Sequence, residues 1–450
     1  MQIHQFLSDN GNRIRKDLNL ADGPPEWGLR AKQKALSNPN FINATVGTAQ
    51  SETGFYFFPT LLKEMQNLSS EEIFGYASMR GVLSFKEAWK KDTINSYHPS
   101  LREKANSLTS DPVPITGGLT GALFTAGQMF LDQGTQVLAP RARWGNVDNC
   151  LSVSLGATIQ SFDLYDKEGH FTFDLLRRKI VKISPSVSRL IIYLNFPNNP
   201  TGYMPTVRDV EKLQDILREV SFPTIIFLDD AYEGYVYETG RSSQENPIPH
   251  SIFPYLLGLN EYVLPVKIDG PSKRFCAYGT RLGMISLGFN SEEDAMTDVG
   301  FKTEGLDFTE TFTKAARGHC SSAPRGIQEA LGRILSDENK LKAIKREREA
   351  LKSLLEKRYW CFLQEIQKQS LNPVLKPLDF NSGFFGFFHV HQYSAKTLAL
   401  ECLDNGIGIV PFENKQTGLN GVRFAFCSVQ AKDIPRAIEL LWYVSQEKGN

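Results

Sequence analysis

Two fixed positive charges lie close together in the stretch KIDGPSKRFCAYGTRLGM. Lys273 and Arg281 are eight residues apart, and Gly279 and Gly283 flank the arginine. Like charges this close repel one another unless an anion lies between them. A single lysine is most often a solvated surface cation, but the paired cations in a glycine-rich turn indicate a bound anion.

Three further runs place polar residues directly after apolar stretches. IIYLNFPNNPTGY ends in Asn199 and an Asn-Pro turn, and IIFLDDAYEGYVY contains Asp229 and Tyr232. Such residues are also ordinary in turns and helix caps. VPITGGLTGALFTAG places glycines and Thr120 at the expected start of a helix, where free N–H groups suit a phosphate. No Gly-Lys-Ser/Thr follows, so this run is not a P-loop.

The helices and strands that must position these residues are expected to alternate along the chain. Helical periodicity is clear at 207–220, where Val210, Leu213 and Leu217 share a face. The expected strands are residues 135–140, 157–164, 189–197, 224–230, 263–269 and 283–289. Short apolar strands between helices predict an α/β fold with a mostly parallel sheet covered on both faces. Ligands bind beyond the carboxyl ends of such strands, where the polar runs lie.

The flanking regions suggest three parts. Residues 1–55 read as an N-terminal arm plus a first strand or loop that contributes to a smaller domain. Residues 56–325 form the large domain with flanking helices. From about 326 a long charged helical region precedes mixed strands and helices, so residues 326–450 are expected to form a small α+β domain.

Composition excludes several classes of protein. The 450 residues carry 50 Lys plus Arg and 50 Asp plus Glu, and this balance argues against a nucleic-acid binder. The six cysteines form no CxxC pair, which is typical of a reducing compartment and gives no zinc motif. No apolar run is long enough to span a bilayer, and no secretory signal is apparent. We therefore expect a cytoplasmic protein without a membrane partner.

The four motifs together resemble the fold-type I pyridoxal-phosphate enzymes, and class I/II aminotransferases of the aspartate/aromatic type in particular. The resemblance covers about residues 41–430 in the family's order. It implies that Lys273 forms the Schiff base with the cofactor, while Arg281 binds the cofactor phosphate through its planar fork. It also implies that Asp229 pairs with the pyridine nitrogen, and that Tyr232 and Asn199 donate to the ring hydroxylate.

Further cofactor contacts follow from the same resemblance. Gly118, Leu119 and Thr120 match the family's phosphate donors at the start of a helix. Trp144 matches the aromatic residue that stacks on the cofactor ring, with a half-buried core tryptophan as the alternative. Tyr76 matches a tyrosine that reaches the phosphate of the partner subunit, which implies a homodimer.

The expected substrates are an amino acid and a 2-oxo acid. Arg423, in an otherwise apolar strand, matches the arginine that binds the α-carboxylate, and Gly47 borders that carboxylate. Arg317 falls where dicarboxylate-specific members carry a second arginine; a structural arginine is an equal alternative. One departure is Gly270, where close members carry a hydroxyl, and Ser272 is the expected replacement.

Three alternatives stay open at this level. A pyridoxal-phosphate lyase or replacement enzyme would use the same residues for β/γ-elimination, decarboxylation or carbon–carbon bond formation. A non-catalytic amino-acid sensor would need a DNA-binding segment, and no basic helix-turn-helix pattern is apparent in the sequence. His389 and His391 share one face of a strand, but without a third ligand we predict no metal site.

Overall fold

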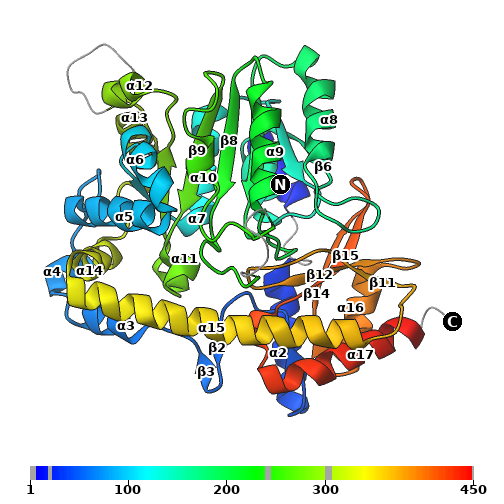
Figure 1. Cartoon of the computed structure of the whole chain (residues 1–450). Coiled ribbons are helices and arrows are strands. Elements are labelled where there is room, and N and C mark those ends of the chain that lie inside the picture. The colour runs from blue at the N-terminus through cyan, green and yellow to red at the C-terminus, as the bar shows by residue number, and fades with distance from the viewer. Residues whose placement is uncertain (1–6, 19–22, 239–244, 299–306, 448–450) are drawn as a thin grey trace.

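A seven-stranded sheet forms the centre of the larger part of the molecule (Figure 1). The computed structural model describes residues 7–18, 23–238, 245–298 and 307–447. The strand order is β4-β10-β9-β8-β7-β5-β6, and only β10 runs antiparallel to its neighbours. The strands are β4 (Val113–Thr116), β5 (Gln136–Pro140), β6 (Thr158–Phe162), β7 (Leu190–Asn195), β8 (Thr224–Asp229), β9 (Val263–Asp269) and β10 (Leu282–Leu287). The predicted mostly parallel sheet is confirmed.

Both faces of this sheet are buried because alternate residues of each strand enter different cores. Ile191 of β7 packs in a core with Ala122 of α7 (Gly118–Phe130), whereas Ile192 packs in another with Leu213 of α9 (Val207–Arg218). Helices accordingly lie on both sides of the sheet (Figure 1). A capping box of Thr206 with Asp209 starts α9.

A second sheet of four antiparallel strands forms the smaller part, in the order β11-β12-β15-β14. Its strands are β11 (Leu375–Pro377), β12 (Gly386–Val390), β14 (Val410–Asn414) and β15 (Leu419–Phe424). Three helices accompany it: α15 (Glu338–Lys368), α16 (Ala395–Asp404) and α17 (Ile434–Glu447). The long helix α15 runs across both parts of the molecule (Figure 1). The expected α+β segment is present. The domain boundaries expected between residues 55 and 56 and between residues 325 and 326 stay predictions.

The N-terminal region belongs partly to the smaller part, because β1 (Ile42–Asn43) pairs in parallel with β13 (Ile407–Gly408). An arm and a first strand or loop were expected here, and two helices, α1 (Asp9–Asp17) and α2 (Pro24–Ser37), were not predicted. The helical signal was weak because α1 buries no residue and α2 buries only Trp27 and Ala31.

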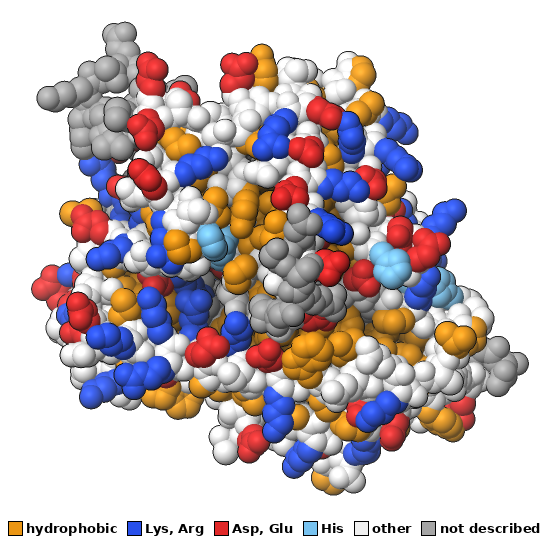
Figure 2. Space-filling model, viewed as in Figure 1, with side chains coloured by type: hydrophobic (Ala, Val, Ile, Leu, Met, Phe, Trp, Pro, Cys, Tyr) orange, Lys and Arg blue, Asp and Glu red, His pale blue; other side chains and the backbone are white. Residues whose placement is uncertain are grey.

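The remaining elements are short or lie around these two sheets. They are β2 (Gln50–Ser51), β3 (Gly54–Phe55), α3 (Pro59–Gln66), α4 (Ser70–Phe74), α5 (Leu83–Ser96), α6 (Pro99–Leu108), α8 (Asp174–Ile183), α10 (Phe253–Leu256), α11 (Pro271–Arg274), α12 (Glu292–Asp298), α13 (Phe308–Cys320) and α14 (Arg325–Ser336). Acidic and basic side chains are interspersed over the face shown in Figure 2. Within the described ranges, no helix is both long and apolar enough to cross a membrane.

Candidate active site

A cavity of about 1200 Å³ opens beyond the carboxyl ends of the parallel strands, where the two parts of the molecule meet. Eight of the residues predicted from the sequence line it. They are Gly47, Leu119, Trp144, Asn199, Asp229, Tyr232, Lys273 and Arg423. Residues more than three hundred positions apart in the sequence therefore line the same cavity. The cavity lies where a mostly parallel sheet is expected to bind ligands, beyond the carboxyl ends of its strands.

Asp229 is the last residue of β8 and is buried. Its carboxylate accepts hydrogen bonds from Tyr193 Oη at 2.8 Å and from the Ala231 N–H at 3.1 Å. Burial raises the pKa of Asp229, and these two donors oppose that effect. A cationic partner in the cavity would offset the cost of burying this carboxylate.

Lys273 follows β9, in the one-turn helix α11. Its Nζ lies 5.5 Å from the centre of the Tyr232 ring. Burial is the main cause that lowers the pKa of Lys273, and the cations Arg281 and Arg423 lower it further, whereas Asp229 opposes them. A larger fraction of this amine is therefore unprotonated at neutral pH than in a surface lysine.

Asn199 connects two other functional side chains. Its Oδ1 accepts a hydrogen bond from Arg423 Nη1 at 3.1 Å, and its side chain also hydrogen-bonds the Tyr232 hydroxyl. The Asn199 backbone N–H donates to Asn195 Oδ1 at 2.7 Å, which fixes the turn after β7. Burial raises the pKa of Tyr232, so its hydroxyl is a hydrogen-bond donor at neutral pH.

The first turn of α7 forms one end of the site. Gly117 caps the helix in the left-handed conformation, and the first N–H groups of a helix have no intrahelical acceptor. Arg281 Nη2 donates to the Gly117 carbonyl at 2.6 Å. A Cβ at Gly118 would lie 2.8 Å from Arg281 Nη2, so only glycine permits this approach. Thr120 lies half-buried in the same turn.

Gly270 and Ser272, which both precede Lys273, explain why this chain lacks the hydroxyl that close family members carry at position 270. A Cβ at Gly270 would lie 2.8 Å from the Leu282 carbonyl oxygen and 3.1 Å from Leu119 Cδ1, so no hydroxyl-bearing side chain fits there. Ser272 is buried, and its Oγ has no hydrogen-bond partner among the described residues. A buried donor without a partner indicates a ligand group at this point.

Arg423 of β15 forms the opposite end of the site. It is buried, and its Nη2 donates to the Thr45 carbonyl at 2.9 Å. The guanidinium lies 4.2 Å from the centre of the Phe385 ring, which also borders Gly47. The Nε atom has no partner within the described chain, so this buried cation keeps a donor for an anion.

Six predicted residues are not among those that line this cavity: Gly118, Thr120, Ser272 and Arg281, whose contacts are given above, and Tyr76 and Arg317. Tyr76 is 87% exposed after α4, and Arg317 is exposed on α13, where its Nη1 donates to Ser321 Oγ at 2.6 Å. Both assignments require a neighbouring subunit and stay predictions. The His389 and His391 rings are 6.4 Å apart, and no group of three potential metal ligands occurs among the described residues.

Three positioning residues were missed from the sequence. Tyr193 and Asn195 lie in β7, which was interpreted as an apolar run, and Asn195 Nδ2 donates to the Asp229 carbonyl at 2.7 Å. Their spacing of two places both side chains on one face of the strand, and this periodicity was the available signal. Tyr235 Oη donates to the Lys273 carbonyl at 2.9 Å, a contact between distant segments that no local pattern indicates.

The arrangement of the two sheets is that of the fold-type I transferases. An aminotransferase from Anaerococcus prevotii superposes with a TM-score of 0.83 at 19% identity, covering 98% of this chain and 100% of its own. The kynurenine aminotransferase of Pyrococcus horikoshii gives a TM-score of 0.75 at 16% identity, covering 100% and 99% of the two chains. At these identities the likeness concerns the fold.

The sequence match then identifies the family. The family model for aminotransferase class I and II matches residues 39–441, so this chain belongs to that family. The tyrosine aminotransferase of Dictyostelium discoideum is 24% identical over 54% of this chain and 51% of its own length. A probable aspartate aminotransferase of Methanocaldococcus jannaschii is 23% identical over 77% and 83%. Several of the curated relatives are matched over only about half of their length.

Proposed function

We propose that this chain is a pyridoxal-phosphate-dependent aminotransferase that moves an amino group between an L-amino acid and a 2-oxo acid. The observation that carries the proposal is Lys273, a half-buried amine with a lowered pKa in a cavity between a buried carboxylate, Asp229, and a buried guanidinium, Arg423. The class I and II family membership supports it.

The residues present fit the cofactor. The unpartnered Ser272 Oγ, the first turn of α7 and the Arg281 guanidinium suit its phosphate, and Asp229 suits its ring nitrogen. Trp144 in the cavity wall is the proposed stacking residue. When bound, pyridoxal phosphate supplies an aldehyde for covalent attachment to an amine and a ring that stabilises a carbanion.

The surrounding side chains then have separate tasks. Asp229, held by Tyr193 and Ala231, keeps a negative charge beside the ring nitrogen. Tyr232 and Asn199 would hold the ring oxygen by hydrogen bonds, with Asn199 fixed by its backbone contact to Asn195. These groups are held by the protein before any ligand binds, which is the condition for electrostatic stabilisation of developing charge.

Substrate binding and proton transfer use the other two charged groups. Arg423, with Gly47 beside it, binds the α-carboxylate and so orients the amino acid toward Lys273. With the cofactor bound, the free Lys273 Nζ would take the α-proton of the substrate as a general base and give it back as a general acid. The lowered pKa of Lys273 suits both roles near neutral pH.

An amino-acid panel tests the proposal. The cofactor-loaded protein is mixed with single amino acids in the absence of an oxo acid, and the cofactor absorbance and the products are followed. An aminotransferase converts the cofactor to its aminated form and releases one equivalent of 2-oxo acid. Release of ammonia without that conversion would instead establish elimination, and release of carbon dioxide would establish decarboxylation.

Covalent labelling tests the lysine assignment. Borohydride reduction of the loaded protein followed by peptide mapping is expected to place the cofactor on Lys273, and Lys273→Ala should prevent attachment. A label on another lysine would refute the assignment.

We also propose a cytoplasmic location. All six cysteines are free, and four of them, Cys150, Cys276, Cys402 and Cys427, are buried, which raises the pKa of their thiols. Free thiols in these numbers are usual in a reducing compartment.

A further inference from the structure

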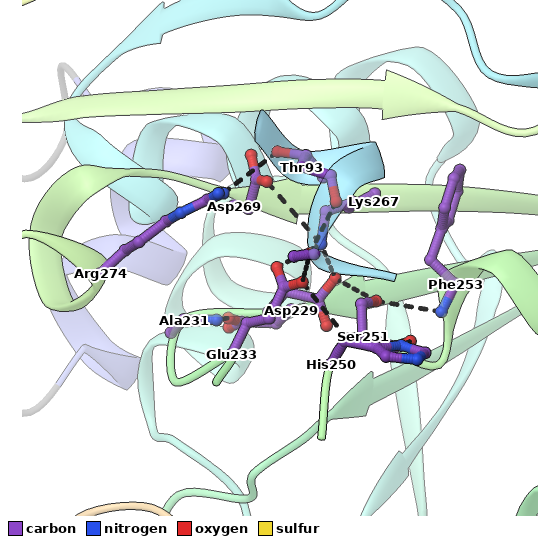
Figure 3. Close-up of polar contacts among 12 residues, drawn as sticks. Thr93, Asp229, Ala231, Glu233, His250, Ser251, Phe253, Lys267, Asp269 and Arg274 are labelled. Carbon is purple, nitrogen blue, oxygen red and sulfur yellow. Dashed lines mark hydrogen bonds and ion pairs between the residues drawn. The ribbon is translucent and has the colours of Figure 1, made fainter. Parts of the chain in front are cut away.

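A buried cluster of charged residues lies directly behind the active-site wall. At its centre is Lys267 of β9, only 2% exposed. Its Nζ donates to Asp230, contacts Glu233 Oε2 at 2.9 Å and lies 3.7 Å from Asp269 Oδ2. Figure 3 shows Lys267 between Asp269 and Glu233, close to Asp229. One ammonium group therefore joins three buried carboxylates.

A second cation and a serine complete the cluster. Arg274 Nη2 donates to Asp92, and its Nη1 donates to Thr93 Oγ1 at 3.1 Å, which connects α11 to α5 (Figure 3). Ser251 Oγ donates to Asp230 Oδ2 at 2.7 Å, and the Ser251 N–H donates to Glu233 at 3.3 Å. The carboxylates are thus held by neutral donors as well as by cations.

The members of this cluster follow the proposed active-site residues in sequence. Asp230 comes after Asp229 and Arg274 comes after Lys273, while Glu233 comes after Tyr232. In each pair the first side chain lines the cavity and the second enters the buried cluster. The position of the cluster therefore determines the position of the two backbone segments that carry the chemistry, the turn at residues 229–233 and the helix α11.

Stability alone is a poor reason for such a cluster. Removing an ammonium group and several carboxylates from water is costly, and well-packed apolar residues in their place are often as stable or more so. The buried charges do impose directional contacts, because each hydrogen bond accepts only a narrow geometry. That property suits the alignment of residues from separate elements.

We propose that Lys267 is a positioning residue of the active site: through Asp230 and Glu233 it holds the turn that carries Asp229 and Tyr232 against β9, and Tyr235 of that turn in turn holds the Lys273 backbone. This inference rests on the proposed aminotransferase function for its catalytic consequence, but not for its structural one. Without the Lys267 ammonium group, Asp230 and Glu233 lose the contact that holds their turn against β9.

The experiment measures hydrogen exchange by mass spectrometry on the full chain without cofactor. In Lys267→Met, which keeps the length of the side chain and removes the charge, peptides covering 229–235 and 271–277 should exchange about tenfold faster. The control is Glu64→Gln, which disturbs another buried carboxylate bound by Arg333 and Lys340, remote from the cavity. It should leave both peptides unchanged.

Kinetics on the loaded protein supply the second measurement. Lys267→Met should lower kcat about tenfold or more with KM changed little, because alignment and not substrate affinity is lost. Lys267→Arg, whose fork can contact both carboxylates, should recover a large part of kcat and of the exchange protection. If no transaminase activity exists in the wild type, the exchange result still decides the positioning role.

Either of two results would overturn the inference. One is an increase in exchange spread evenly over the sheet in Lys267→Met, and the other is wild-type exchange in both peptides. If Lys267→Met does not fold, Glu233→Gln replaces it, since this variant keeps the size and the Ser251 contact. It should show the same localised exchange to a smaller degree, and an absence of localised exchange there would refute the positioning role.

Discussion

The charge environment of Lys273 leads to a prediction about its titration in the cofactor-free protein. Only the unprotonated amine reacts with an aryl halide, so labelling increases as pH rises through the pKa. The midpoint should lie below the ordinary value of 10.5, because burial and the cations Arg281 and Arg423 lower it. Arg423→Met should raise the midpoint, and Asp229→Asn should lower it.

Peptide mapping after fluorodinitrobenzene treatment at a series of pH values measures this titration. Exposed Lys167 in the same digest reports the intrinsic reagent reactivity. Shifts of the two variants in the same direction would contradict the proposed electrostatic arrangement around Lys273.

A second prediction at the residue scale concerns Asp229. Asp229→Asn keeps the size of the side chain and removes its charge, so the ring nitrogen loses the anion that keeps it protonated. We expect weaker cofactor binding and a kcat lower by about a hundredfold, as for the loss of one preorganised electrostatic group. Steady-state kinetics at saturating cofactor test this, and a wild-type rate would show that the role assigned to Asp229 is wrong.

Arg317 leads to a prediction about specificity. If it reaches a substrate side chain across a dimer, a desolvated bidentate pair contributes about 2–5 kcal/mol of discrimination for dicarboxylic amino acids. Arg317→Leu should then strongly lower kcat/KM for aspartate and glutamate and leave neutral amino acids unchanged. Equal effects on both classes would leave Arg317 as a structural residue bound to Ser321.

At the scale of elements, the turn between β9 and β10 predicts how the phosphate is bound. Ser272→Ala removes the buried, unpartnered hydroxyl and should weaken cofactor binding about tenfold, since a hydrogen bond to a charged group contributes about 1.5–3 kcal/mol. Gly270→Ser would add the hydroxyl that close family members carry at this position. It should also destabilise the fold, because the new Cβ would lie too close to the Leu282 carbonyl oxygen.

We expect Gly270→Ser to lower the free energy of unfolding by about 1–3 kcal/mol, as overpacking does. Equilibrium denaturation measures this change, and titration of each variant with the cofactor measures the affinity. Tighter cofactor binding in Gly270→Ser would contradict the steric explanation for glycine at this position.

The elements differ in how far the sequence could predict them. The strands β7 and β8 were predictable because they are buried on both faces and therefore apolar throughout. The residues at their ends, Asn199 and Asp229, followed from the strand ends and the family motif. The Lys267 cluster was not predictable, because its members are isolated charges in strands, turns and helices whose partners lie up to 182 positions away.

At the scale of the whole molecule, the site depends on contact between its two parts. Arg423 of the smaller sheet donates to Asn199 in the turn that follows β7 of the larger sheet, and to the Thr45 carbonyl of the N-terminal region. A shift of either part moves the proposed carboxylate site relative to Lys273. Substrate binding between the two parts would therefore favour the arrangement in which they approach each other.

The last prediction is a homodimer in which Tyr76 of one subunit reaches the cofactor phosphate of the other. The segment around Tyr76 exposes large apolar side chains, which favour burial against a partner. They are Phe55, Phe57, Phe74, Met79 and Leu83. Light scattering should therefore give twice the mass of the chain, and Tyr76→Phe should weaken cofactor binding without changing that mass.

A charge in this segment tests whether it forms the interface. Phe74 is 85% exposed in the single chain, so Phe74→Glu should leave the fold intact while placing two charges in a buried contact. We expect monomers with reduced cofactor affinity. Leu371→Glu, at a fully exposed position elsewhere, is the matched control and should remain dimeric. A fully active monomer would refute both the dimer and the role of Tyr76, because the phosphate site would then be complete within one chain.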